Sequence, residues 1–241
     1  MEDHLGLFLD YLSVEKGLSK NTLSAYQRDL KSYLAFLKKS KIKSLETVSR
    51  KHIMEYLLAE RDRGLNPSSV SRGLVAIRMF HRFLAEEGKI REDVTQALES
   101  PKLFKHLPEA LNVAEVESLI ASPNVRKAQG MRDHAVLELM YATGLRASEV
   151  TGLKTGHLNF ETGVIRIFGK GEKERVVPMG QASQKSLKRY LEKARPVWTK
   201  GGAEDALFVS KLGKRMSRQT VWGILKKYAK LAGVRKKIYP H

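Results

Sequence analysis

The stretch "YATGLRASEVTGL", residues 141–153, predicts two helices joined through a single glycine. Gly144 is a natural stop for the helix that contains residues 132–141. Ser148 and Glu149 favour the first turn of the next helix, because acidic side chains are stabilising near a helix N-terminus. Arg146 therefore lies at a helix start. Its guanidinium could bind a phosphate together with backbone N–H groups, or it could pair with the Glu149 carboxylate. The stretch alone leaves both interpretations open.

A Gly- and Lys-rich loop follows in "GVIRIFGKGEKERVVPM", residues 163–179. The strand-like runs 164–168 and 175–179 flank this loop, which is the pattern of a β-hairpin. Glycines on both sides of Lys170 let the backbone turn tightly and approach a ligand. An ammonium group at the tip could protonate a leaving oxygen. The alternative is a solvated loop whose lysines only aid solubility.

The first hundred residues are predicted to be helical. Apolar residues recur at helical spacing in four segments, and Ser19, Ser49 and Asn66 are suited to begin the last three of them. Four helices with short connections indicate a small bundle. Two prolines and a lack of periodicity in residues 99–112 indicate a linker. We therefore expect a helical domain over 1–100, a linker over 101–111 and a second domain over 112–241.

The second domain is predicted to be mainly α with a small β-hairpin or sheet, an α+β arrangement. A capping pattern at Asn112 opens a helix, another helix is expected near 181–193, and a short strand is expected at 207–210. Ser217 can cap a last, basic amphipathic helix that ends at Gly233. Its inward residues are expected to be Val221, Ile224 or Leu225, Tyr228 and Leu231.

The charge points to a polyanionic partner. The chain has 44 Lys and Arg against 26 Asp and Glu, a formal net charge of +18. Residues 1–105 carry 19 basic and 14 acidic side chains, residues 106–241 carry 25 and 12, and no acidic residue follows Asp205. This distribution favours nucleic acid over a merely soluble surface of mixed charge. Candidate DNA contacts are Lys173, Arg175, Lys214, Arg215, Arg218, Gln219 and Thr220.

Several other classes of site are missing from the sequence. There is no cysteine, hence no disulfide and no thiolate metal site. We find no Walker A loop, dinucleotide fingerprint or metal-spaced His/Asp/Glu cluster. No apolar run is long enough to span a bilayer, and the acidic N-terminus does not fit a signal peptide. We therefore expect a cytoplasmic protein without a metal, a cofactor or a membrane partner.

The order of three motifs resembles the tyrosine recombinases, specifically their Xer type. These motifs are "GLSKNTLSAYQRDL" (17–30), "LMYATGLRASEVTGL" (139–153) and "GKGEKERVVPM" (169–179). The resemblance covers essentially the whole chain. It implies an N-terminal SAM-like helical bundle and a catalytic domain that close around duplex DNA as a C-shaped clamp.

The resemblance also implies a chemistry. Members of the family break a DNA strand by attack of a tyrosine hydroxyl on a phosphodiester, which leaves a 3′-phosphotyrosyl link. Arg146 matches the first catalytic arginine, Lys170 the hairpin lysine that protonates the departing 5′-oxygen, and Glu149 the supporting acid. His241, in "IYPH", matches the histidine that opens the His-x-x-Arg box. The nucleophile has no match in these 241 residues, so we expect this chain, as a C-terminally truncated recombinase, to bind DNA without cleaving it.

The implied partners are a double-stranded recombination site, further recombinase protomers in a tetramer on two sites, and a DNA translocase. The implied role is resolution of chromosome or plasmid dimers, which would serve chromosome partition and cell division. One alternative is a phage or mobile-element integrase of the same fold, although no extra arm-binding domain is visible at the N-terminus. The other is a non-catalytic DNA-binding module derived from a recombinase.

Overall fold

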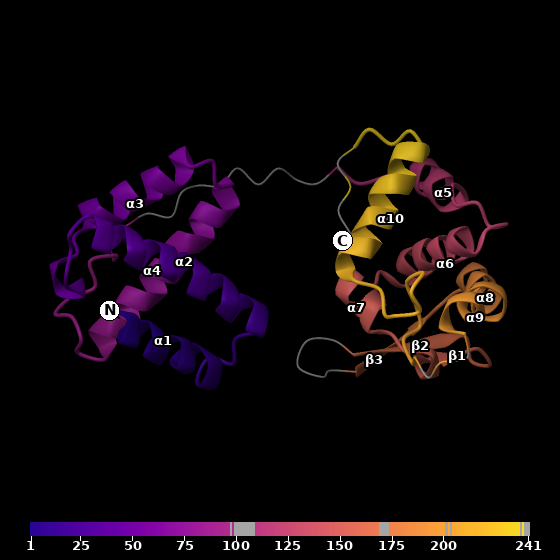
Figure 1. Cartoon of the computed structure of the whole chain (residues 1–241), viewed down its shortest axis with the longest axis horizontal. Helices are drawn as coiled ribbons and strands as arrows, with labels where there is room; N and C mark the ends of the chain where they lie inside the picture. Colours follow the sequence, from indigo (N-terminus) through magenta and orange to yellow (C-terminus); the bar gives the residue numbers. More distant parts are fainter. Residues whose placement is uncertain are drawn as a thin grey trace. The chain divides into compact units, whose positions relative to one another are not determined.

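The chain folds into two compact units, Met1–His106 and Leu107–His241, each with its own hydrophobic core (Figure 1). The computed structural model describes residues 1–96, 98, 109–168, 174–200, 202, 204–236 and 238. The expected linker 101–111 falls largely outside these residues, so its boundaries stay a prediction. In the described part, no helix has the length and apolar character needed to cross a membrane.

The first unit contains the four helices expected from the sequence. They are α1 (Glu2–Val14), α2 (Lys20–Lys39), α3 (Arg50–Asp62) and α4 (Pro67–Glu86), with a 3₁₀ turn at Leu45–Thr47. The Ser19 hydroxyl accepts a hydrogen bond from the Thr22 N–H at 3.3 Å and so caps α2. The Asn66 side chain caps α4 in the same way, with Pro67 in its first turn.

Large aromatic side chains fill the first core. Phe8, Tyr33 and Phe80 are fully buried. His81 is buried with them, and its Nε2 lies 3.0 Å from the Tyr33 hydroxyl. Burial lowers the pKa of His81 to about 4, since an apolar environment disfavours the charged ring. His81 is therefore a neutral packing residue of this core.

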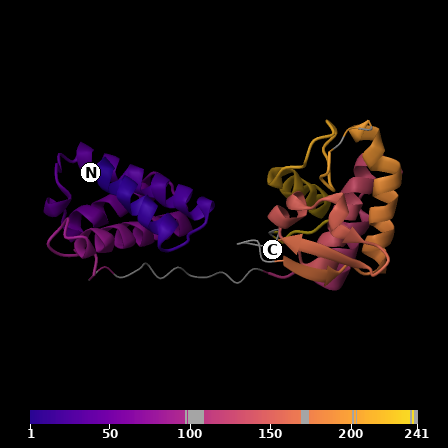
Figure 2. The same ribbon diagram turned by 90° about the horizontal axis from the view of Figure 1, so that it is seen from below.

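The second unit combines six α-helices and three strands in its described part. The helices are α5 (Val113–Ala121), α6 (Ala128–Thr143), α7 (Ala147–Gly152), α8 (Gln181–Arg189), α9 (Arg195–Thr199) and α10 (Arg218–Leu231). The strands β1 (Leu158–Asn159), β2 (Val164–Phe168) and β3 (Glu174–Pro178) form an antiparallel sheet in the order β1-β2-β3. The sheet forms one edge of the unit (Figure 1, Figure 2).

Alternation along β2 and β3 decides which side chains face the core. Ile165 and Ile167 of β2 are buried. The cross-strand partner of Ile167 is Arg175, and that of Ile165 is Val177. Partners in an antiparallel pair lie on the same face, so Arg175 and Val177 share the inward face with the two isoleucines. An arginine thus stands on the core side of the hairpin.

Some expected elements differ from the observed ones. Strand β3 begins one residue earlier than expected, and the two-residue strand β1 was not expected. The helix expected to end near 193 continues through a π-helical segment, Tyr190–Ala194, into α9. Residues 207–210 form no strand: within this range only Val209 makes an isolated bridge, with Arg215, and the preceding Ala206 makes another with Lys154. Leu231 was expected inside but is 64% exposed, because Ala229 and Ala232 face the core at this end of α10 instead.

A buried polar cluster joins α10 to α6. The Arg132 guanidinium lies 2.7 Å from Asp133 Oδ1 and donates to the Val209 carbonyl at 3.1 Å. The Tyr228 hydroxyl of α10 donates to Asp133 Oδ2 at 3.0 Å. Each of these buried polar groups therefore has a partner, which removes most of the cost of burying it. The cluster fixes the orientation of α10 against α6.

Candidate active site at the start of helix α7

The backbone places Arg146 at the junction predicted from the sequence. Gly144 ends α6 with φ 63°, and its N–H donates to the Met140 carbonyl at 2.9 Å. Arg146 is the N-cap residue of α7. Leu145 and Ala147, on either side of Arg146, are buried in the second core. The backbone at Arg146 is thus fixed by packing, while its side chain is 65% exposed.

Glu149 joins Arg146 to the hairpin. Its Oε2 accepts a hydrogen bond from the Arg146 backbone N–H at 2.8 Å. Arg175 of β3 donates to both oxygens, from Nη1 to Oε1 at 2.8 Å and from Nη2 to Oε2 at 3.0 Å. The Glu149 side chain is only 7% exposed. The Arg175 guanidinium is the main reason that the pKa of Glu149 lies below its usual range, with the Arg146 N–H adding to it.

The two interpretations of Arg146 can now be compared. Its guanidinium approaches the carboxylate of Glu149 only at 3.5 Å, through Nη1. The shorter, bidentate partner of that carboxylate is Arg175. Arg146 therefore presents an exposed guanidinium beside the N–H groups of a helix start, which is suited to a phosphate.

A pocket of about 580 Å³ opens beside α7. It is lined by Arg146, Ser148, Glu149, Gly152, Leu153, His157 and Phe168. Phe168 is the last residue of β2. The pocket thus lies between the start of α7 and the end of β2, and the Arg146 guanidinium lines it.

His157 is a pocket residue that the sequence did not indicate. Its ring packs on Phe168 with centroids 5.1 Å apart, and its Nδ1 accepts from the Lys154 backbone N–H at 3.3 Å. Partial burial and the positive charges of Lys154 and Arg166 lower the pKa of His157. No motif marks this histidine. The only available signal was its three-residue spacing from Lys154, which is typical of a local cap.

The other predicted site residues fall into two groups. Lys170, Lys173 and His241 lie outside the described residues. The second group lies on the turn before α10 and on its first turn. Lys214, Arg215, Arg218 and Gln219 are exposed there. Thr220 is partly buried, and its N–H donates to the capping Ser217 hydroxyl at 3.2 Å, so α10 begins as predicted. Helix α10 packs against α7 (Figure 1), which brings the basic helix and the Arg146 junction into one structural unit.

Solved structures share this fold. The chain is similar to a lambda integrase (75–356) dimer bound to a COC′ core site, with a TM-score of 0.76 at 18% identity over 98% of this chain and 80% of that one. It is also similar to the XerH site-specific recombinase bound to a difH substrate, with a TM-score of 0.73 at 18% identity over the same shares. At such identities the likeness shows the fold, and the expected integrase-like architecture is confirmed.

Sequence comparisons show the family. Residues 109–241 match the phage integrase family, and residues 5–88 match its N-terminal SAM-like domain. The tyrosine recombinase XerD of Staphylococcus aureus (strain Mu50) is 40% identical over 241 residues, which are 100% of this chain and 82% of that protein. XerD of Staphylococcus epidermidis is 40% identical over 234 residues, 97% of this chain and 79% of that protein. The resemblance inferred from the three motifs is confirmed, and the chain belongs to the phage integrase family of tyrosine recombinases.

Proposed function

We propose that this protein acts as a Xer-type site-specific recombinase and binds the reacting DNA phosphate at the start of α7. The family to which it belongs breaks and rejoins DNA strands, and its 40% identical relatives are Xer recombinases. The observation that carries the proposal is the exposed guanidinium of Arg146, fixed at a helix start while Glu149 is occupied by Arg175. The net charge of +18 supports DNA as the partner.

In the proposed reaction of the family, a tyrosine hydroxyl, for which these 241 residues offer no match, attacks the scissile phosphorus. The tyrosine O–P bond forms while the P–O5′ bond breaks, so the phosphodiester energy is kept in the 3′-phosphotyrosyl link and no ATP is needed. Negative charge builds up on the phosphoryl oxygens in the transition state, and fixed cations stabilise it. We assign Arg146 to a non-bridging oxygen. Glu149 holds the Arg146 backbone, which keeps that guanidinium in place.

Two roles rest on the family motifs alone. Lys170 is proposed to give its proton to the departing 5′-oxygen, and His241 to act as the histidine of the His-x-x-Arg box. A lysine has an ordinary pKa of about 10.4 and is therefore protonated and able to act as an acid near neutral pH. Neither residue lies in the described part of the chain.

The proposed substrate is a double-stranded recombination site. Lys173, Lys214, Arg215, Arg218, Gln219 and Thr220 are proposed to contact its phosphates and base edges. We further propose that four protomers assemble on two such sites and that a DNA translocase controls them. The proposed role is the resolution of chromosome or plasmid dimers in the cytoplasm, which serves chromosome partition and cell division. The Xer relatives support this role over that of a phage integrase, because the lambda integrase likeness concerns the fold alone.

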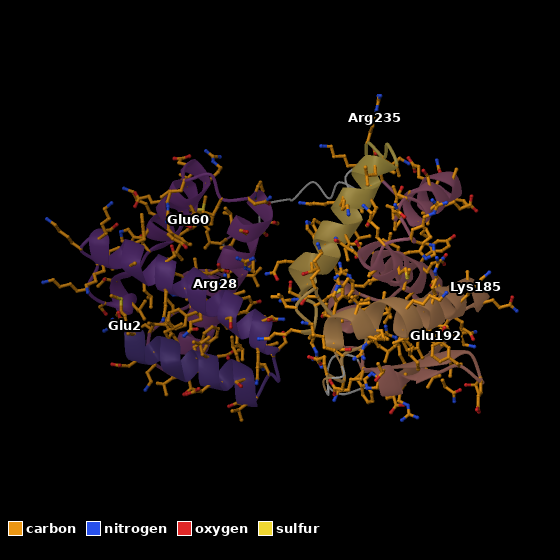
Figure 3. The ribbon with its side chains drawn as sticks, turned by 45° about the vertical axis from the view of Figure 1, so that its right-hand side comes forward. Glu2, Arg28, Glu60, Lys185, Glu192 and Arg235 are labelled. Carbon is orange, nitrogen blue, oxygen red and sulfur yellow. The ribbon has the colours of Figure 1, made fainter. Side chains whose placement is uncertain are left out.

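Salt-dependent DNA binding tests the proposal. We expect the affinity for a duplex of about 30 base pairs to fall steeply as salt rises from about 50 to 200 mM. The reason is that each lysine or arginine that neutralises a phosphate releases counterions from the DNA. Arg146→Ala should reduce the slope of log K against log salt by about one. The matched control is Lys185→Ala, which removes one exposed cation of α8 that extends away from the second unit (Figure 3). A flat salt response, or equal effects of the two variants, would contradict the proposal.

A further inference from the structure

Arg175 of β3 lies on the same face of the sheet as its cross-strand partner Ile167, which is buried, and the Arg175 side chain is 40% exposed. A partly buried charge is costly unless it is paired and hydrogen-bonded. Arg175 meets this requirement through the bidentate contact with Glu149, at 2.8 and 3.0 Å. Such a fork geometry is directional, and it ties β3 to the first turn of α7.

The Glu149 carboxylate also lies near a second arginine, Arg146. Arg146 and Glu149 are three residues apart, a spacing at which side chains of opposite charge on a helix normally pair. Yet Arg146 Nη1 lies 3.5 Å from Glu149 Oε1, while Arg175 Nη1 lies 2.8 Å from the same oxygen. Both guanidinium groups thus approach the same carboxylate, and Arg175 makes the shorter contacts. The Arg146 guanidinium consequently stays available to solvent.

We propose that Arg175 is a positioning residue, which occupies the Glu149 carboxylate and thereby leaves the Arg146 guanidinium free for a DNA phosphate. It also fixes β3, the strand that contains it, to the first turn of α7. The inference rests on the proposed function, in which Arg146 binds a phosphate. It replaces the direct DNA contact that the sequence suggested for Arg175.

Replacing Arg175 should leave the Glu149 carboxylate to pair with Arg146. Without its bidentate partner, the buried carboxylate would draw in the Arg146 guanidinium, since an unpaired buried charge is costly. A phosphate would then have to displace Glu149 from Arg146. The effect of replacing Arg175 on DNA binding should therefore be exerted through Arg146.

The hairpin supplies a matched control on its outer face. Arg166 of β2 pairs with Glu174 of β3 at 3.0 Å, and both side chains are well exposed. Arg166→Gln removes the same charge and breaks an ion pair of the same hairpin. It does not touch Glu149, so it reports the general effect of a lost cation and a lost cross-strand contact.

The test is a double-mutant cycle on the salt slope of binding to a duplex of about 30 base pairs. Arg146→Ala and Arg175→Gln should each lower the slope of log K against log salt by about one, and the double variant should also lower it by about one. Arg166→Gln should lower the slope by less than Arg175→Gln. A double variant that loses about two would show independent contacts and overturn the inference.

A rescue experiment distinguishes positioning from direct contact. Glu149→Gln in the Arg175→Gln background removes the charge that captures Arg146, so the slope should return to the wild-type value. A slope that stays at the Arg175→Gln value would overturn the inference. If Arg175→Gln alone does not fold, the double variant Arg175→Gln/Glu149→Gln can be measured in its place, because its two amide side chains can still hydrogen-bond to each other. If Arg146→Ala has no effect, the proposed function fails; if it has its effect and the cycle is additive, only the inference fails.

Discussion

At the scale of single residues, the Glu149 carboxylate is buried and accepts hydrogen bonds from two arginines. Its pKa lies below the usual range, chiefly because of the hydrogen bonds from Arg175. A carboxyl group with a lowered folded-state pKa stabilises the fold at a pH above its unfolded pKa, and that stabilisation is lost as the pH falls through the folded value. Glu149 thus makes the stability of the second unit sensitive to acid.

Glu149→Gln should remove this part of the pH dependence. We expect the variant to lose about 1.5–3 kcal/mol of unfolding free energy near neutral pH, the order of a hydrogen bond to a charged group. The difference from wild type should shrink in acid, where the wild-type carboxyl is protonated as well. Urea unfolding across a pH series measures this, and a difference independent of pH would contradict it.

His81 provides a second pH-sensitive position, in the first unit. Its folded pKa is about 4, against 6.5 for the free side chain. Between these values the unfolded chain binds a proton that the folded chain does not, so stability should fall as the pH drops from 6.5 to 4, by about 3 kcal/mol. His81→Gln keeps a polar partner for Tyr33 but cannot titrate. The urea midpoint of His81→Gln should therefore fall less than that of the wild-type protein as the pH drops from 6.5 to 4.

The sequence could predict some of these residues and not others. Gly144 and the acidic first turn marked Arg146 and Glu149, because both signals are local. The partner of Glu149 is 26 residues away, on another element, and no local pattern identifies it. Arg175 was therefore interpreted from its charge as a DNA contact. His157 was missed for the same reason, since its neighbour Phe168 belongs to β2.

At the scale of elements, the joint between α6 and α7 depends on one backbone conformation. Gly144 has φ 63°, and an added Cβ would meet nothing within 4 Å. Gly144→Ala should therefore destabilise through backbone strain alone, by about 1–2 kcal/mol. Gly144→Asn should cost less, since asparagine tolerates this conformation.

Gly223 gives the matched control for this prediction. It lies in α10 with no positive φ and with nothing within 4 Å of an added Cβ. Gly223→Ala should stabilise by about 0.5–1 kcal/mol, because alanine is favoured in helices. Thermal unfolding compares the two variants. Similar shifts in the same direction would disprove the role given to the Gly144 conformation.

Helix ends marked by glycine or by a capping side chain could be predicted from the sequence, as Gly144, Ser19 and Ser217 show. Elements that depend on distant partners could not. Strand β1 has two residues and exists because it pairs with β2. The π-helical segment has no sequence signal of its own; its Tyr190 hydroxyl accepts from the Val209 N–H at 3.1 Å, a contact set by tertiary packing.

At the scale of the whole molecule, the uneven charge predicts an uneven contribution to DNA binding. Replacing Lys214, Arg215 and Arg218 with glutamine should lower the salt slope by about three, if each contacts a phosphate. The control replaces Lys38, Lys39 and Lys43, three exposed cations of the first unit. It should lower the slope by less. Equal losses would indicate non-specific attraction by net charge and contradict the assignment of the α10 region.

The family and the mainly helical architecture could be predicted from the order of motifs and from helical periodicity. The net charge and its distribution along the chain predicted a polyanionic partner. Lys170 and His241 remain assignments by motif, because both lie outside the described residues. Their roles depend on a phosphate held by several elements at once, and such an arrangement is a property of the complex with DNA.

The two separate hydrophobic cores have a consequence for how such a protein can evolve. Among the residues that the structure describes, no buried side chain belongs to both cores. Substitutions that repack the helices of the first unit therefore leave the packing around Leu145 and Val150 unchanged. The packing that fixes the backbone of Arg146 and Glu149 can therefore stay the same while the side chains of the first core change. Each unit can thus accumulate core substitutions under its own selective pressure.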